Sequence, residues 1–115
     1  MQYTRIYADD MGESHFEEVD ILLTDKGMVG ALSAAFMVKN LIFRENKATY
    51  DWDFHTAPAR QFIILLDGEI EITTSLGEVR RFGAGNVLLV EDVTGKGHKT
   101  KNISIQERRS IFIEL

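Results

Sequence analysis

The chain has 115 residues, of which 44% are hydrophobic and 27% charged, which fits one globular domain. Its formal net charge of −5 argues against general nucleic-acid binding and against docking on anionic membranes, because both favour basic surfaces. The absence of cysteine excludes disulfides and thiolate metal sites. With no apolar signal-like stretch at residues 1–10, we expect a cytoplasmic protein whose partners are small molecules or other proteins.

The N-terminal part is expected to form an arm, at about residues 1–25, on a single domain that spans residues 1–115. Residues 16–23 are compatible with a short helix or with an extended segment. The small residues at 30–35 predict a loop.

Short strands dominate the rest of the chain, separated by turns such as Asp67-Gly68. They are predicted at residues 40–44, 61–66, 69–74, 78–82, 87–90, 100–105 and 110–115. Turn residues recur about every 8 to 12 positions, which is typical of an all-β sandwich or barrel.

The histidines are the candidate reactive groups, because imidazole binds transition metals and carries protons near neutral pH. His98 follows Gly95 and Gly97, which permit a sharp turn and the close approach of a ligand. The alternative is a histidine on an exposed hairpin turn. His15 lies among acidic residues and is expected to be an exposed histidine of the arm, with no role assigned.

The segment before His55 alternates between a polar side and an aromatic side if it is a regular strand. The polar side is Asp51, Asp53 and His55, and the aromatic side is Tyr50, Trp52 and Phe54. This pattern suits a polar pocket wall backed by aromatic rings, or equally a strand with a polar solvent face. Gln61 opens the next apolar strand in register with Ile63, so it is either a ligand-pocket residue or a satisfied structural amide.

Part of this region has the spacing of a known motif. Gln61 and Gly68 stand where the first motif of the cupins, which are small jelly-roll barrels, has its Glu and its closing Gly. With a three-residue spacer, His55 takes the place of the first motif histidine and Ala57 that of the second. The chain resembles the cupins in this spacing.

The second cupin motif has a counterpart near the C-terminus. Gly95, Gly97 and His98 reproduce its Gly-x-x-His part, and Asn102 stands at its Asn, while Val93 replaces its proline. The chain also resembles a group of short, single-domain bacterial cupins in GESHFEEVDILL, FHTAPARQ and RRFGAGNVLLVEDVTGKGHKTK. The resemblance implies an all-β fold, a double-stranded β-helix or RmlC-like jelly-roll barrel.

Cupins usually hold iron, manganese, nickel or zinc with three histidines and a glutamate. By resemblance, His55, Gln61 and His98 are the candidate ligands of one divalent metal, which is Fe, Mn, Ni, Co or Zn. Glutamine is a neutral donor, weaker than a carboxylate, so this site is expected to bind metal weakly.

Three functions are compatible with this sequence. The first is a metal-assisted enzyme acting on a small organic acid or carbonyl compound. The second is a metal-free binding protein whose ligand contacts Trp52, Phe54, Gln61 and Ile63. The third is an isomerase- or epimerase-type enzyme in which His98 or His55 is the catalytic acid or base.

By resemblance, the chain is also expected to form a homodimer, in which a strand at residues 3–7 adds to the sheet of the partner.

Overall fold

The computed structural model describes residues 1–115 and consists almost entirely of β-strands, which confirms the all-β class predicted from the sequence. One short 3₁₀ helix, η1, spans Gly27–Val29. The strands are β1 (Gln2–Ala8), β2 (Ser14–Asp20), β3 (Thr24–Asp25), β4 (Ala31–Leu32), β5 (Asn40–Asn46), β6 (Asp51–His55), β7 (Gln61–Leu65), β8 (Glu69–Thr74), β9 (Val79–Gly83), β10 (Val87–Val90), β11 (His98–Asn102) and β12 (Arg108–Glu114).

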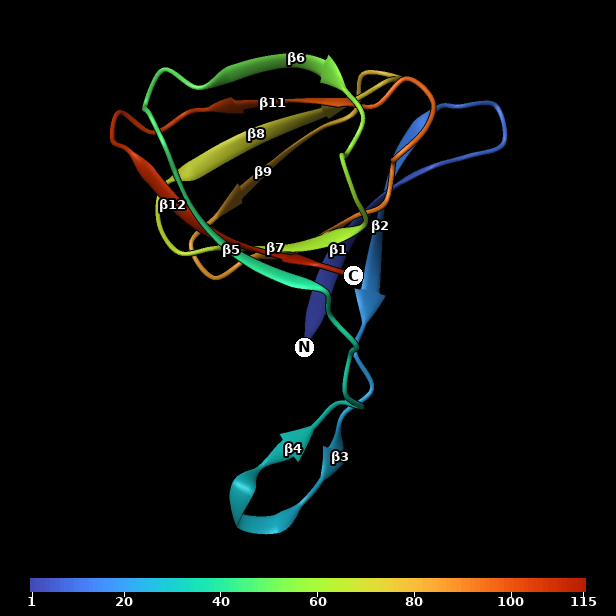
Figure 1. The fold of residues 1–115 in the computed structure, drawn as a ribbon, viewed down its shortest axis with the longest axis vertical. Helices are drawn as coiled ribbons and strands as arrows, with labels where there is room; N and C mark the ends of the chain where they lie inside the picture. The colour runs from blue at the N-terminus through green and yellow to red at the C-terminus, as the bar shows by residue number, and fades with distance from the viewer.

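Two sheets face each other to form the barrel (Figure 1). The larger sheet has the order β2-β1-β10-β7-β12-β5 and the smaller has the order β6-β11-β8-β9. The last eight strands are therefore divided equally between the sheets and are interleaved as in a jelly roll of two Greek keys. The jelly-roll architecture expected from the sequence is confirmed by this strand order.

The alternation of apolar and polar residues explains which faces are buried. In β8, Ile70 and Ile72 point into the barrel, whereas Glu71 between them does not. In the larger sheet, Ile6, Leu65 and Leu88 are fully buried. Burying an aliphatic side chain of this size contributes about 1.5–3 kcal/mol, so this core holds the two sheets together.

The N-terminal residues form part of the large sheet and not an arm. β1 pairs antiparallel with β2 along its whole length and parallel with β10 through residues 4–6. The extended alternative for residues 16–23 is confirmed by β2. Both edges of β1 are occupied within the chain, so its expected addition to the sheet of a partner would require an exchange of strands and stays a prediction.

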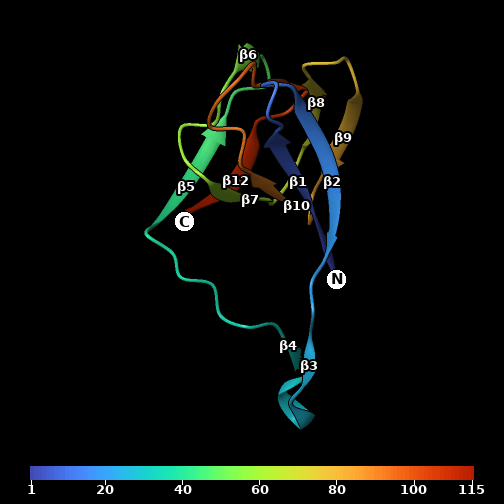
Figure 2. The same ribbon diagram turned by 90° about the vertical axis from the view of Figure 1, so that its right-hand side faces the viewer.

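The segment that projects from the barrel is instead residues 21–39. It carries β3, η1 and β4, and the two views show it extending away from both sheets (Figures 1 and 2). The loop expected at residues 30–35 includes β4, which pairs with β3. The structure contains no helix with the length and apolar character needed to cross a membrane.

The strand expected at residues 100–105 lies at β11 instead. Gly97, with a φ of 72°, turns the chain directly into this strand, which therefore begins at His98. It ends where the side-chain amide of Asn102 donates hydrogen bonds to the carbonyl oxygens of Ala48, Ser104 and Gln106.

Candidate functional site

A cavity of about 80 Å³ lies between the two sheets and is lined mainly by apolar side chains of the core. A single water needs about 10–15 Å³ in the same measure, so the cavity suits a small organic compound. The polar groups on its wall include Arg44, Tyr50, His55, Gln61, His98 and Arg108. They come from strands that are distant in sequence and that the jelly-roll topology brings together.

The structure brings His55 and His98 together, as the cupin-like spacing predicts. They are direct partners across the antiparallel pair β6–β11. Their ring centroids are 4.8 Å apart, and the ring planes are inclined by 54°. Two imidazoles from different parts of the chain therefore border one cavity.

His98 is fixed by Asp92, a residue that the sequence analysis did not identify. The Nδ1 atom of His98 donates a hydrogen bond to Oδ2 of Asp92 over 2.6 Å, and both side chains are buried. A carboxylate can only accept here, so the proton of neutral His98 lies on Nδ1 and Nε2 remains free. Asp92 lies in the loop before β11, and no sequence pattern indicates that it reaches His98.

His55 is stacked on Trp52, with ring centroids 3.7 Å apart and planes inclined by only 7°. Regular alternation in β6 predicts that these side chains lie on opposite sides of the strand, and this prediction is wrong. The register of β6 against β11 shifts next to His98, so one extra residue stands between Trp52 and His55. This β-bulge brings both rings to the cavity side of the strand.

The ring of His55 is held from its other edge by the backbone. Its Nδ1 atom donates a hydrogen bond of 2.8 Å to the carbonyl oxygen of Asp53, which leaves Nε2 free. Burial of the ring lowers the pKa of His55 below its ordinary value, and the nearby His98 lowers it further, while the Asp53 carbonyl opposes both effects. His55 is therefore neutral at pH 7.

The other predicted ligand-contacting residues divide into two groups. Gln61, with 4% of its surface exposed, and Ile63 line the cavity together with Trp52. Phe54 does not line it: the ring is 45% exposed and lies 5.5 Å from Nζ of Lys99. The bulge that turns Trp52 toward the cavity leaves Phe54 on the outside, so the interpretation of Phe54 as a ligand contact was wrong.

Arg44 and Arg108 were also missed by the sequence analysis. They lie on the neighbouring strands β5 and β12, where Arg44 pairs with Ser110 and Arg108 with Asn46. Arg108 is 3% exposed and donates from Nη2 to Oδ1 of Asn46 over 3.0 Å. Each arginine has a charged neighbour, Glu45 beside Arg44 and Arg109 beside Arg108, so the sequence does not show which side chain of each pair points inward.

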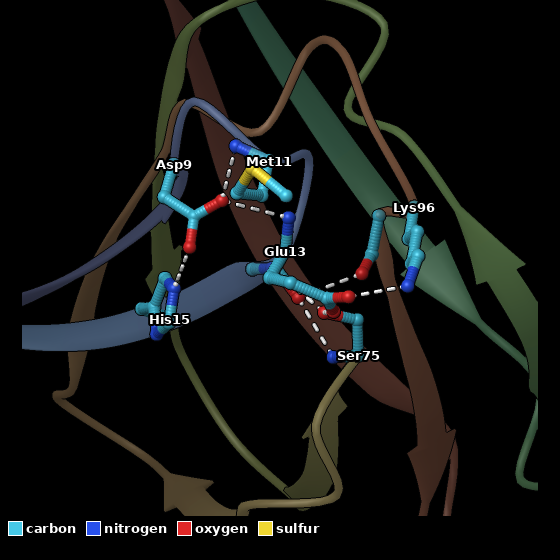
Figure 3. A network of polar contacts seen from close by, with 8 residues as sticks. Asp9, Met11, Glu13, His15, Ser75 and Lys96 are labelled. Atoms are coloured by element: carbon cyan, nitrogen blue, oxygen red, sulfur yellow. Dashed lines mark hydrogen bonds and ion pairs between the residues drawn. The ribbon is translucent and has the colours of Figure 1, made fainter.

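A polar network at the β1–β2 turn supports the loop that leads into His98 (Figure 3). Glu13 forms an ion pair with Lys96 and accepts a hydrogen bond of 2.5 Å from the hydroxyl of Ser75. These contacts lower the pKa of Glu13. The hydroxyl of Ser14 donates to the carbonyl oxygen of Gly97 over 2.7 Å. The first β-hairpin therefore helps to set the position of β11.

His15 belongs to this network and not to the cavity. Its Nε2 atom lies 2.6 Å from Oδ2 of Asp9, and this hydrogen bond is the main reason why the pKa of Asp9 is lowered. The side chain is about one-third exposed, at 33%. The structure gives His15 a role in holding the first turn.

The residues around the cavity do not fit a resident divalent metal ion. His55, Gln61 and His98 do line one cavity, but no group of three His, Cys, Asp or Glu side chains there or elsewhere could hold a metal. Arg44 and Arg108 add positive charge to the same wall, which opposes a divalent cation. A neutral amide does not supply the negative charge that such an ion needs.

No protein-family model and no curated protein matches this sequence. Several solved structures are similar, among them the following three. A Neisseria meningitidis protein has 18% identity and a TM-score of 0.49 over 69% of this chain and 80% of its own. An RmlC-like cupin protein from Desulfovibrio desulfuricans has 13% identity and a TM-score of 0.47 over 98% of this chain and 81% of its own. A Salmonella typhimurium protein assigned to ethanolamine utilization has 11% identity and a TM-score of 0.43 over 99% of this chain and 94% of its own.

At these identities the likeness does not extend to activity or ligand. The fold is established by the chain itself, through the order of its strands and the two sheets that enclose the cavity. This protein is a small jelly-roll barrel.

Proposed function

We propose that the barrel binds a small organic molecule and that His98, oriented by Asp92, transfers a proton to or from it. The observation that carries this proposal is the buried 2.6 Å hydrogen bond between Nδ1 of His98 and Asp92 at the wall of a cavity. Apart from stability, such a pair has a chemical use: it fixes the tautomer and leaves the basic Nε2 atom free to face a ligand.

The proposed step is proton abstraction next to a carbonyl group. The lone pair of His98 Nε2 takes a proton from the carbon atom beside the carbonyl, and the electrons of that C–H bond move to form an enolate. Asp92 stabilises the imidazolium that results. Return of the proton to a different position or face gives an isomer or epimer, so the step balances without any co-reactant.

His55 supports this assignment by its charge and its position. It is neutral because burial lowers its pKa, so it does not repel the imidazolium that forms on His98. Its ring is only 4.8 Å from that of His98, which places a second imidazole beside the same ligand. Stacking on Trp52 restricts its rotation.

Exchange of carbon-bound hydrogen with solvent tests the proposal. The protein is incubated in D₂O with small ketones, 2-oxo acids and 2-hydroxy acids, and deuterium incorporation is followed by proton NMR. We expect protein-dependent incorporation in at least one class, its loss in His98→Gln, and no change in His15→Gln, a matched histidine outside the cavity. Thermal unfolding of each variant checks that it is folded.

Two results would overturn the proposal. One is the absence of protein-dependent exchange in every class. The other is exchange that persists undiminished in a folded His98→Gln protein. Ligand-dependent stabilisation without exchange would identify the chain as a binding protein.

A further inference from the structure

Arg108 is a buried cation without a counter-charge. Its guanidinium group donates from Nη2 to the amide oxygen of Asn46, but the buried Nε atom has no hydrogen-bond partner in the protein. None of the ion pairs in the structure includes Arg108. Buried charges in proteins are normally paired, because removing an ion from water is costly.

Arg44 brings a second positive charge to the same place. Arg44 faces Ser110 across the β5–β12 pair, and Arg108 is two residues from Ser110, so both arginines lie on one face of the sheet. Both line the cavity, and Arg44 also forms no ion pair. Burial lowers the pKa of Arg108, and the charge of Arg44 lowers it further.

Aromatic rings offset part of this charge but do not use its hydrogen-bond donors. The guanidinium carbons of Arg44 and Arg108 lie 5.4 and 5.6 Å from the centre of the Tyr50 ring. Such cation–π contacts are attractive but satisfy none of the N–H donors. The nearby acid Asp67 is engaged by Arg109, at 2.8 Å, and does not pair with either arginine.

We infer that the ligand of the cavity is a small carboxylic acid whose carboxylate is bound by Arg44 and Arg108. A planar carboxylate matches the parallel N–H donors of a guanidinium group, and both arginines line the cavity. A cavity of about 80 Å³ suits a small acid. A carboxylate carries one charge, so it is cheaper to bury here than a phosphate dianion.

This inference deepens the proposed function, since it rests on the same cavity being the ligand site. With its carboxylate on the arginines of the larger sheet, the rest of the acid extends toward His55 and His98 on the smaller sheet. A carbonyl or hydroxyl group next to the carboxylate then lies near the imidazoles. Short 2-oxo and 2-hydroxy acids combine both features.

Matched acids and amides test the inference at constant ionic strength. Pyruvate and lactate are compared with lactamide and acetamide by thermal shift and by the fluorescence of Trp52, the single tryptophan of the chain. We expect the acids to raise the unfolding temperature and the amides to leave it unchanged. Inorganic phosphate is included as a second anion.

Variants at the arginines separate recognition from folding. Arg44→Met and Arg108→Met are each expected to weaken acid binding at least tenfold. Arg109→Met is the matched control, because Arg109 is an exposed arginine of the same strand β12 and lies outside the cavity. Without ligand, Arg108→Met is expected to unfold at the same or a higher temperature, because it removes an unpaired buried charge. If Arg108→Met does not fold, the loss of acid binding in Arg44→Met decides the outcome.

Equal binding of acids and amides, or acid binding that survives in both arginine variants, would overturn the inference. Arginine-dependent binding of phosphate but not of either acid would overturn the carboxylate class. Failure of the proposed function looks different: acids would bind in an arginine-dependent way but exchange no deuterium. Exchange on neutral ketones that is unaffected by Arg44→Met would instead support the proposed function alone.

Discussion

His98 and Asp92, six residues apart in the chain, are joined by a 2.6 Å hydrogen bond from Nδ1 to Oδ2 inside the barrel wall. Asp92 is fully buried, and its second oxygen has no partner. Burying a carboxylate in this position lowers the stability of the fold unless its negative charge is offset by interaction with His98. The pair is therefore the first target for mutation.

Asp92→Asn is expected to lower the rate of deuterium exchange by about 10²–10⁴-fold, in the range of general acid–base effects. Asparagine keeps the size of the side chain but no longer stabilises an imidazolium or enforces one tautomer. Acid binding, measured by thermal shift, should change little, because Arg44 and Arg108 are untouched. An unchanged exchange rate would assign Asp92 a purely structural role.

Protonation of His55 should quench the fluorescence of Trp52, because the two rings are stacked at 3.7 Å and an imidazolium quenches an excited indole. Burial lowers the pKa of His55, so quenching should develop below the ordinary histidine value of about 6.5. His55→Gln should abolish this titration, and His15→Gln should preserve it. A titration that persists in His55→Gln would contradict the assignment.

The same pKa shift predicts how stability depends on pH. A histidine whose pKa is lowered in the folded state takes up its proton first in the unfolded chain, so protons favour unfolding. Its contribution is complete above about pH 6.5 and is lost as the pH falls through the lower, folded-state value. Urea unfolding of the wild type and of His55→Gln between about pH 7 and 5 measures this difference. The variant should show the flatter dependence.

Gly97→Ala should disrupt the site more than other turn substitutions. Gly97 has a φ of 72°, and an added Cβ would collide with the backbone carbonyl of His55. Gly77→Ala is the matched control, because Gly77 has a φ of 92° but open space around it. The control should lose only about 1–3 kcal/mol for the backbone conformation, as measured by urea unfolding.

In Gly97→Ala the loss should be larger, and the pH-dependent quenching of Trp52 should change, because the collision moves His55. If both variants lose the same free energy of unfolding, the backbone near His55 can move to accommodate the added methyl group without further destabilisation.

Metal analysis tests the ligand set that the cupin-like spacing implies. Protein purified without a histidine tag is expected to contain no stoichiometric Fe, Mn, Ni, Co or Zn, because Arg44 and Arg108 oppose a divalent cation at His55 and His98. Treatment with a chelator should leave the unfolding temperature and the exchange activity unchanged. One equivalent of metal that is lost in His98→Gln would reverse this conclusion.

The expectation of a homodimer stays a prediction, and both edges of β1 are already paired within the chain. The edge strand β5 exposes Leu41, Ile42 and Phe43, and the projecting segment exposes Phe36 and Met37. Light scattering at micromolar concentration should give the mass of a dimer. Phe43→Glu should shift it toward monomer, whereas Val79→Glu, at an exposed apolar position on the other sheet, should not.

The sequence alone determined the fold class and part of the site. Short alternating strands and turn glycines predict a β-barrel because strand faces and tight turns depend on local residue types. The positions of His55, Gln61, Gly97 and His98 in the candidate site could also be predicted, since their spacing matches that of a known motif.

Only the tertiary structure decided how the cavity is charged and which rings meet. A period of two assigns faces in regular strands, but a one-residue bulge reverses it. For this reason Trp52 and His55 were predicted on opposite sides of the strand, and Phe54 was included among the ligand contacts. Asp92 reaches His98 from a loop, where no periodicity applies. Arg44 and Arg108 share a wall because β5 pairs with β12 in one register, and that register is set by long-range packing and not by local sequence.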